Sequence, residues 1–175
     1  TVNKKRASRD NLPANLILSR DAWDRLPEFK PIRETTGLNF GCFVQMPVEK
    51  GIALLCGMNI LDVPLPSNDL ERDYRVWAKK VIENIEKFDA LYIHIKGPDE
   101  PGHDGDCRKK KEVIELIDRH FFGSLLPNIS DEVIIAITGD HSTPCILGAH
   151  SADPVVVAIY GAESDGTFSF GEKEA

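Results

Sequence analysis

The sequence lacks several patterns that would assign a protein to a class at once. No apolar stretch approaches the roughly 18 to 20 residues that cross a bilayer. No apolar core follows the basic start Thr1–Arg6, so we expect neither a membrane segment nor a secretory signal. The 21 Lys and Arg are outnumbered by 28 Asp and Glu, and the net charge of −7 argues against non-specific nucleic-acid binding. We therefore expect a cytoplasmic protein without nucleic-acid or membrane partners.

Cysteine is sparse and scattered. The four cysteines form no CxxC pair, and we expect them to be reduced and partly buried, with paired disulfides as the less favoured alternative. The sequence contains no HExxH, GxGxxG, Walker or GxSxG motif. This excludes the commonest signatures of zinc proteases, dinucleotide-binding enzymes, P-loop enzymes and serine hydrolases. A catalytic site would have to be built from other residues.

What the sequence does contain is an alternation of apolar runs and amphipathic segments. Its 175 residues are enough for one domain with a sizeable core. We predict strands at 14–20, 37–45, 60–65, 90–96, 133–138 and 155–160, and helices at 47–56, 69–88 and 107–122. Asn68 and Glu71 suit a capping box before the second helix. The unbroken apolar run at 133–138 is typical of a strand covered on both faces. The alternation predicts an α/β fold, a mostly parallel sheet sandwiched by helices.

The densest group of potential ligands lies at 96–106, directly after the apolar run 90–95. Asp99 and His103 are four residues apart, so on a helical turn they face the same way and can share one metal ion. A helix-capping aspartate and a solvated histidine are the plainer alternative. Lys96 lies at the same strand end, where it would either bind a phosphate oxygen or pair with a nearby carboxylate. His94 alternates with isoleucines and is predicted to be a satisfied core histidine.

A second group follows the apolar run 133–137. Asp140 and His141 would point to opposite faces of a regular strand, but Gly139 marks a break, so both can turn toward one ion. The alternative is a turn aspartate with a surface histidine. His150 is a third candidate imidazole. Sites in parallel sheets lie beyond the carboxyl ends of the strands, which would bring these loops together. Mixed Asp and His ligands suit Mn, Zn or Co better than Ca, and two such ions about 4 Å apart can stabilise a phosphoryl transfer.

These segments resemble a known family, the archaeal-type cofactor-independent phosphoglycerate mutases of the alkaline phosphatase superfamily. The resemblance is collinear over nearly the whole chain and is carried by 94–106, 138–144 and 150–154, with further matches at 12–15, 50–53 and 57–58. It implies interconversion of 2-phosphoglycerate and 3-phosphoglycerate in glycolysis and gluconeogenesis. A metal-activated serine would take the phosphate and return it to the other hydroxyl. The alternatives are another phosphatase or phosphomutase of that superfamily, or an inactive metal-binding module.

Carried over by position, the resemblance implies two divalent metal ions. Asp99, His103 and His150 would hold one of them. Asp140 and His141 would help to hold the second. Manganese is the expected metal, with zinc, cobalt or magnesium as alternatives.

The resemblance also relates Lys50 to a phosphate-contacting lysine, and Lys96, from its place at the strand end, is expected to contact the substrate, phosphoglycerate, as well. The family's serine nucleophile and a further aspartate find no match in residues 1–40. We therefore expect residues 1–175 to be the C-terminal part of the metal-binding phosphatase-like domain, with 1–13 as the return segment from an inserted mutase domain. No residue in this chain is then assigned as the nucleophile. A homo-oligomer is left open.

Overall fold

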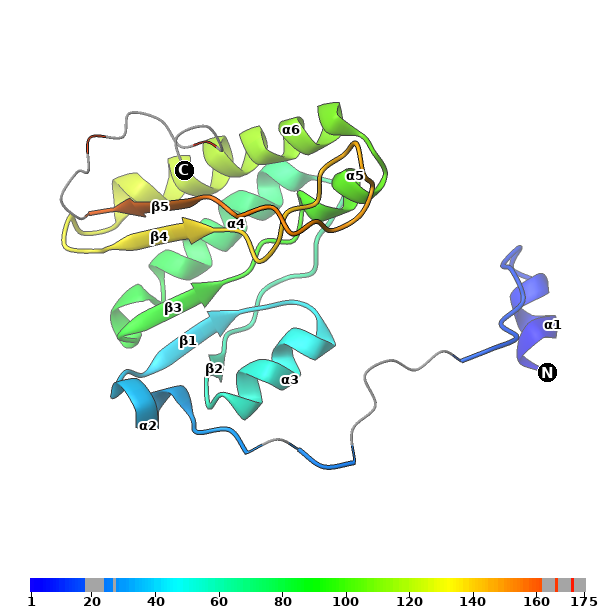
Figure 1. Ribbon diagram of the computed structural model, residues 1–175, viewed down its shortest axis with the longest axis horizontal. Helices are drawn as coiled ribbons and strands as arrows, with labels where there is room; N and C mark the ends of the chain where they lie inside the picture. Colours follow the sequence, from blue (N-terminus) through cyan, green and yellow to red (C-terminus); the bar gives the residue numbers. More distant parts are fainter. Residues whose placement is uncertain (18–23, 27, 162–165, 167–170, 172–175) are drawn as a thin grey trace.

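Five short strands form the framework of the part of the chain that the structure describes. The structure is a computed structural model, and it describes residues 1–17, 24–26, 28–161, 166 and 171. Strands β1 (Phe40–Phe43), β2 (Asn59–Ile60) and β3 (Ala90–Ile93) form a parallel sheet in the order β2-β1-β3. Strands β4 (Ile135–Thr138) and β5 (Val157–Tyr160) pair antiparallel. The predicted α/β fold with a parallel sheet and helices is confirmed, and the antiparallel pair is its departure from parallel order (Figure 1).

The main core lies where helix α4 (Leu70–Ile82) packs against the strands and a second helical segment. Tyr74, Trp77 and Val81 recur at steps of three and four, so they form one buried stripe. They pack with Phe43 and Phe121. The second segment consists of α6 (Cys107–Leu116), the π-helical η2 (Ile117–Phe122), α7 (Gly123–Leu125) and the 3₁₀ turn η3 (Leu126–Asn128). Figure 1 shows α4 and α6 behind the strands, so they cover one side of the fold.

Some predicted boundaries are wrong. The helix predicted at 69–88 ends at Ile82 and is followed by the 3₁₀ turn η1 (Ile85–Lys87). Its N-cap is Asp69, whose carboxylate accepts the Arg72 N–H at 3.0 Å, so Asn68 is not the cap. The strand predicted at 60–65 is only Asn59–Ile60. Residues 14–17 form no strand, and 18–20 of that predicted strand lie outside the described residues. Two short helices, α1 (Val2–Ala7) and α2 (Ile32–Thr36), lie outside the three predicted helices.

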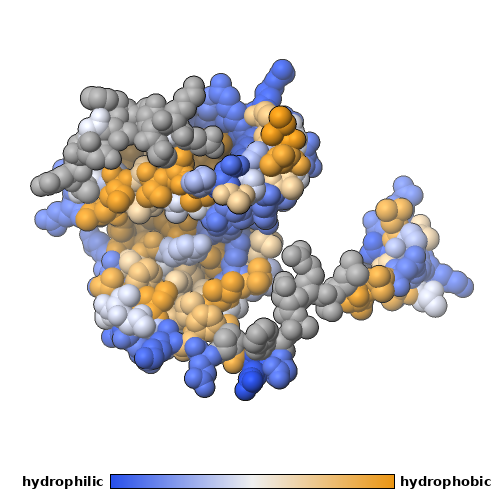
Figure 2. Space-filling view, viewed as in Figure 1, coloured by the Kyte–Doolittle hydropathy of each residue, from blue (hydrophilic) through white to orange (hydrophobic). Residues whose placement is uncertain are grey.

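Strand β4 is not covered on both faces, contrary to its apolar sequence. Its residues alternate between half-buried and exposed, and Ile134 beside it is exposed. On β5, Val157, Ile159 and Tyr160 are exposed as well. Figure 2 shows these apolar residues as a band over β4 and β5 on the face away from α4 and α6. The sequence predicted burial from composition. Among the described residues, however, no helix covers the second face of β4 and β5, whereas α3 covers that face at β1 through Ala53, which packs with Cys42 and Val44.

The segments that follow β1, β3 and β4 carry the predicted ligands. Helix α3 (Pro47–Leu55) follows β1, with Pro47 at its first position and Gly57, at φ 71°, beyond its end. Helix α5 (Asp99–His103) follows β3. The loop after β4 is closed by a bridge between Ser142 and Ser151. Among the described residues, none of the helices has the length and apolar character that crossing a membrane requires.

Candidate metal centre

Asp99 and His103 lie at the two ends of helix α5, one turn apart. His103 Nε2 is 3.4 Å from Asp99 Oδ1, as the spacing of four residues predicts. The other ring nitrogen, Nδ1, is 3.1 Å from the carbonyl oxygen of Gly148. A carbonyl only accepts, so Nδ1 carries a proton and donates it. In the neutral ring, Nε2 then presents its lone pair to Asp99.

His150 completes a triangle of ligand atoms with this pair. Its Nε2 is 3.1 Å from His103 Nε2 and 3.7 Å from Asp99 Oδ1. A tetrahedral ion with metal–ligand distances of about 2.0–2.1 Å places its ligand atoms about 3.3–3.4 Å apart. The three separations match that spacing. The residues present therefore fit a divalent ion, and the structure brings together the three side chains that the sequence grouped.

Thr143 connects this triangle to the next segment. Its side chain is 4% exposed, and its hydroxyl donates to Asp99 Oδ1 at 2.9 Å. The hydroxyl oxygen of Thr143, Oγ1, also lies 3.1 Å from His141 Nδ1. Because the single hydroxyl proton goes to the carboxylate, Thr143 accepts from the Nδ1–H of His141. The neutral His141 ring then has its lone pair on Nε2. Thr143 was not singled out from the sequence.

The environment of Asp99 keeps its carboxyl ionised. Burial acts to raise its pKa, but the hydrogen bond from Thr143 and the charges of His103, His141 and Lys96 outweigh burial, and the pKa is lowered. An ionised carboxylate offers two acceptor oxygens and no proton. Asp99 is therefore in the form that binds a cation.

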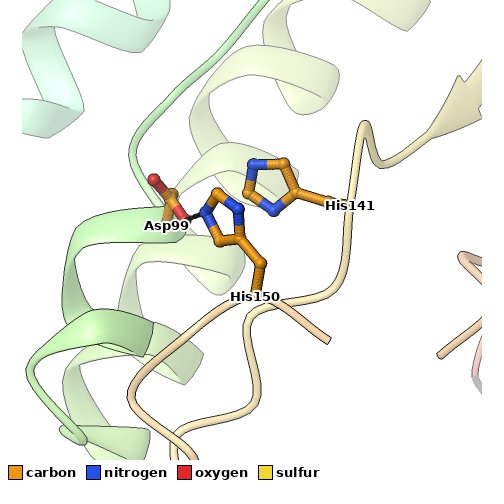
Figure 3. A group of neighbouring side chains, drawn as sticks. All are labelled: Asp99, His141 and His150. Atoms are coloured by element: carbon orange, nitrogen blue, oxygen red, sulfur yellow. Dashed lines mark ion pairs between the residues drawn. The ribbon is translucent and has the colours of Figure 1, made fainter. Parts of the chain in front are cut away.

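Asp140 and His141 lie beside the triangle. His141 Nε2 is 3.3 Å from Asp140 Oδ2, while Asp140 Oδ1 accepts the backbone N–H of His141 at 3.0 Å. The His141 ring stacks on that of His150, with centroids 3.6 Å apart. Asp99, His141 and His150 each offer an atom within 4.8 Å of the others (Figure 3). The structure thus brings together all five predicted metal ligands, and His141 lies near both predicted ligand sets.

The two lysines predicted to contact the substrate lie in different surroundings. Lys96 Nζ is 4.0 Å from Asp99 Oδ2 and 3.4 Å from the sulfur of Met46, and its side chain is 39% exposed, so it lies at the mouth of the centre. Lys50 is exposed on α3, and the structure records no polar side-chain contact for it within the described part of the chain. Of the two predicted substrate contacts, only Lys96 is placed at the ligand cluster.

Two further residues complete the surroundings. His94 is not a core residue, because its side chain is 21% exposed. Its Nδ1 lies 2.8 Å from Glu49 Oε1, and its Nε2 lies 3.9 Å from Asp140 Oδ2. The expectation that His94 has a partner holds, but the sequence did not identify Glu49 as that partner. Glu49 lies three residues after Met46, a spacing that signals a helix start and gives no sign of the contact with His94.

The cysteines take no part in this centre in the structure. All four are free thiols. Cys42 is buried in the small cluster formed with Val44 and Ala53, and burial raises its thiol pKa. The expected reduced state therefore agrees with the structure.

Comparison with known proteins links this geometry to a family. Residues 52–175 match the model of the Metalloenzyme superfamily. A 2,3-bisphosphoglycerate-independent phosphoglycerate mutase of Aeropyrum pernix is 44% identical over 163 residues, which cover 90% of this chain and 38% of the relative. The enzyme of the same name from Thermoplasma volcanium is 37% identical over 168 residues, covering 96% and 40%. The resemblance seen in the sequence is confirmed, and the chain spans about 40% of the length of these relatives.

Two solved structures agree with this fold. A protein from Pyrococcus horikoshii superposes with a TM-score of 0.83 at 32% identity, over 99% of this chain and 46% of that one. A cofactor-independent phosphoglycerate mutase from Thermoplasma acidophilum gives a TM-score of 0.64 at 30% identity, over 99% and 41%. The arrangement of strands and helices is therefore shared with these two solved structures.

Proposed function

The chain belongs to the Metalloenzyme superfamily, and on that premise we propose that it supplies the metal-binding part of an enzyme that interconverts 2-phosphoglycerate and 3-phosphoglycerate. The reaction would be a cytoplasmic step of glycolysis and gluconeogenesis. The relatives that carry the name phosphoglycerate mutase support this proposal. The observation that carries it is the convergence of Asp99 Oδ1, His103 Nε2 and His150 Nε2 at separations of 3.1–3.7 Å.

This convergence favours a bound cation for an electrostatic reason. Gly148 fixes the proton of His103 on Nδ1, so the neutral Nε2 turns a lone pair toward a carboxylate oxygen. Acceptors at this distance repel one another unless a proton or a metal ion lies between them. Carboxylate and imidazole together suit Mn²⁺, with Zn²⁺, Co²⁺ or Mg²⁺ as alternatives. We assign the first ion to Asp99, His103 and His150.

A second ion is supported by the same reasoning at Asp140 and His141. Thr143 fixes the proton of His141 on Nδ1, so Nε2 presents its lone pair to Asp140 Oδ2 at 3.3 Å. The hydroxyl of Thr143 also holds Asp99, so one side chain orients a ligand of each ion. We propose that the two ions share one phosphate between them.

In the proposed reaction, a serine carries the phosphate from one hydroxyl of the glycerate to the other. The bound ions would lower the pKa of the attacking hydroxyl and neutralise the phosphate oxygens. From this chain, Lys96 would donate to a phosphate oxygen, since its ammonium lies beside Asp99 and is partly exposed. Lys50 remains a proposed contact whose side chain would have to reach the phosphate from α3.

Metal binding is tested by calorimetric titration of Mn²⁺ into the 175-residue chain. We expect Asp99→Asn to weaken binding at the first site at least 10-fold to 100-fold, because it removes a charged ligand. Glu100→Gln is the matched control, because Glu100 is the exposed neighbour on the same helix. Equal affinities for both variants and the parent chain would overturn the metal assignment.

Substrate class is tested on the intact protein, which includes the serine nucleophile. Its rate of conversion of 3-phosphoglycerate is compared with its rate of hydrolysis of generic phosphate esters. Faster hydrolysis of generic esters would favour another phosphatase of the superfamily. From residues 1–175 alone we expect no mutase turnover, because no serine in this chain is assigned as the nucleophile. Turnover by a homogeneous sample of this chain would contradict that part of the proposal.

A further inference from the structure

The loop after β4, residues 139–150, packs closely against α5 and the start of α6 (Figure 1). A Cβ added to Gly102 of α5 would meet the carbonyl oxygen of Thr143 at 2.7 Å. Lys110 of α6 donates from Nζ to that same carbonyl oxygen at 2.7 Å. Between these points, a Cβ at Gly105 would lie 3.4 Å from the carbonyl oxygen of Cys145. The loop and the segment 102–110 are therefore in van der Waals contact along their length.

This contact brings together two cysteines from distant parts of the chain. Cys107 is the first residue of α6, and its backbone N–H donates to Gly105 O at 3.2 Å, so it lies beside the glycine that faces Cys145. The two side chains meet as well, since a hydrogen bond with Cys107 is the main cause that raises the pKa of the Cys145 thiol. Both residues are free thiols. They are therefore a pair of neighbouring, reduced sulfur atoms.

The other two cysteines have different surroundings. Cys42 is buried in its cluster with Val44 and Ala53, and Cys56 is the C-cap of α3. Cys107 is exposed, whereas Cys145 is half-buried. Thiol–disulfide exchange requires access of the oxidant to the attacking sulfur. An oxidant in solution therefore reaches Cys107 first, and Cys145 is the sulfur beside it.

We infer that Cys107 and Cys145 form a reversible disulfide that fastens the loop 139–150 to the start of α6. The oxidant is a low-molecular-weight disulfide, for which oxidised glutathione is the probe. The Cys107 thiolate attacks one sulfur of this disulfide, which forms a mixed disulfide and releases one thiolate. Cys145 then gives its proton to water and attacks the Cys107 sulfur, which forms the protein disulfide and releases the second thiolate. Two electrons pass from the protein to the small disulfide, which leaves as two thiols.

The fastened loop is the one that carries His141 and His150, and also Thr143 and Gly148, which hold the side chains of Asp99 and His103. A disulfide removes conformations from the unfolded chain. Because the two thiols already meet, the bond preserves the contacts of the loop. The inference does not depend on the proposed function, since no proposed metal ligand takes part in the disulfide.

The bond is tested by treating the reduced 175-residue chain with excess oxidised glutathione, followed by thiol titration and peptide mapping by mass spectrometry. We expect the four free thiols to fall to those of Cys42 and Cys56, with a cross-link between Cys107 and Cys145 that dithiothreitol reverses. Cys145→Ser should stop at the mixed disulfide on Cys107. Cys56→Ser is the matched control and should cross-link like the parent. No cross-link in the parent, or glutathione adducts spread over the four cysteines, would overturn the inference.

The fastening is tested by thermal unfolding of the metal-free proteins. The cross-link should raise Tm by about 4–16 °C in the parent chain and in Cys56→Ser. Treatment of Cys145→Ser should give no such rise, and dithiothreitol should abolish the rise in the parent. A fully cross-linked parent whose Tm is unchanged or lower would refute the fastening.

Titration with Mn²⁺ separates this inference from the proposed function. We expect the oxidised parent to bind Mn²⁺ as tightly as the reduced parent, because the bond keeps the loop against α5. If neither form binds Mn²⁺, the metal assignment fails, and the cross-link and Tm still decide the inference. If only the reduced form binds Mn²⁺, the metal assignment stands, and the bond draws the loop away from α5, which refutes the fastening of the loop in place.

Discussion

Replacing Thr143 by valine should damage both the stability of the chain and its metal affinity. The side chain is almost fully buried, and its hydroxyl makes two contacts, to Asp99 Oδ1 at 2.9 Å and with His141 Nδ1 at 3.1 Å. Valine keeps the shape and removes both contacts. A hydrogen bond to a charged group contributes about 1.5–3 kcal/mol and one between neutral groups about 0.5–1.5 kcal/mol. We expect a loss of about 2–4 kcal/mol, or about 5–15 °C in Tm for a chain of this size.

The effect on metal binding has a separate cause. Without the hydroxyl, Asp99 loses a donor and His141 loses the acceptor that fixes its proton on Nδ1. Both proposed ions should therefore bind more weakly, by about 10-fold to 100-fold each. Calorimetric titration with Mn²⁺ measures this loss, and thermal unfolding of the metal-free chain measures the change in stability.

Thr143→Ser is the matched control, because serine keeps the hydroxyl and loses only the methyl group. That methyl group lies close to Gly102, as a Cβ built there would meet it at 3.1 Å. We expect the serine variant to lose about 1 kcal/mol of stability and to bind Mn²⁺ like the parent chain. If the valine variant binds Mn²⁺ as tightly as the parent, or if serine loses as much affinity as valine, the hydroxyl does not organise the centre.

Three further predictions concern acid stability and packing. The pKa of Asp99 is lowered below its ordinary value of 3.8. Its contribution to stability is therefore present above that value and is lost as the pH falls through the lower, folded pKa. In urea unfolding of the metal-free chains, the free energy of unfolding of the parent should fall more steeply below about pH 4 than that of the Asp99→Asn variant, and equal slopes would contradict this. Gly102→Ala should destabilise the chain by about 1–3 kcal/mol, because the added Cβ would lie 2.7 Å from Thr143 O. Gly51→Ala, on α3, places its Cβ in open space and should stabilise the chain by about 0.5–1 kcal/mol. Unchanged urea midpoints for both variants would contradict this. Trp77→Ala, at a side chain 5% exposed, should cost about 3–5 kcal/mol in urea unfolding, and a loss under 1 kcal/mol would remove Trp77 from the core.

The sequence predicted best where one segment carries the whole signal. The stripe of helix α4 depends on residues three and four apart, so its buried side chains followed from periodicity alone. The pairing of Asp99 with His103 is also local, since one helical turn brings them together. The strand order and the antiparallel pairing of β4 with β5 are not local, and the sequence carried no sign of them.

The polar residues around the ligands were missed for a related reason. Thr143 contacts a carboxylate 44 residues away along the chain, and a lone threonine in a loop has no pattern that reveals such a partner. Glu49 has a local explanation as a helix cap, which hides its contact with His94. Polar residues that support a site give weaker sequence signals than the ligands, because any hydroxyl or carboxylate at the right place will serve.

The geometry of the loop after β4 explains why the ligands meet at all. Ser151 donates its backbone N–H to Ser142 O at 3.0 Å, so the chain turns back and returns His150 to the side of His141. The carbonyl of Gly148, in the same loop, then holds the ring of His103 from α5. One loop therefore supplies ligands and also orients a ligand of another segment. A change that opens the Ser142–Ser151 bridge would separate the two imidazoles and release His103 at once, so the metal centre depends on this loop closing as a unit.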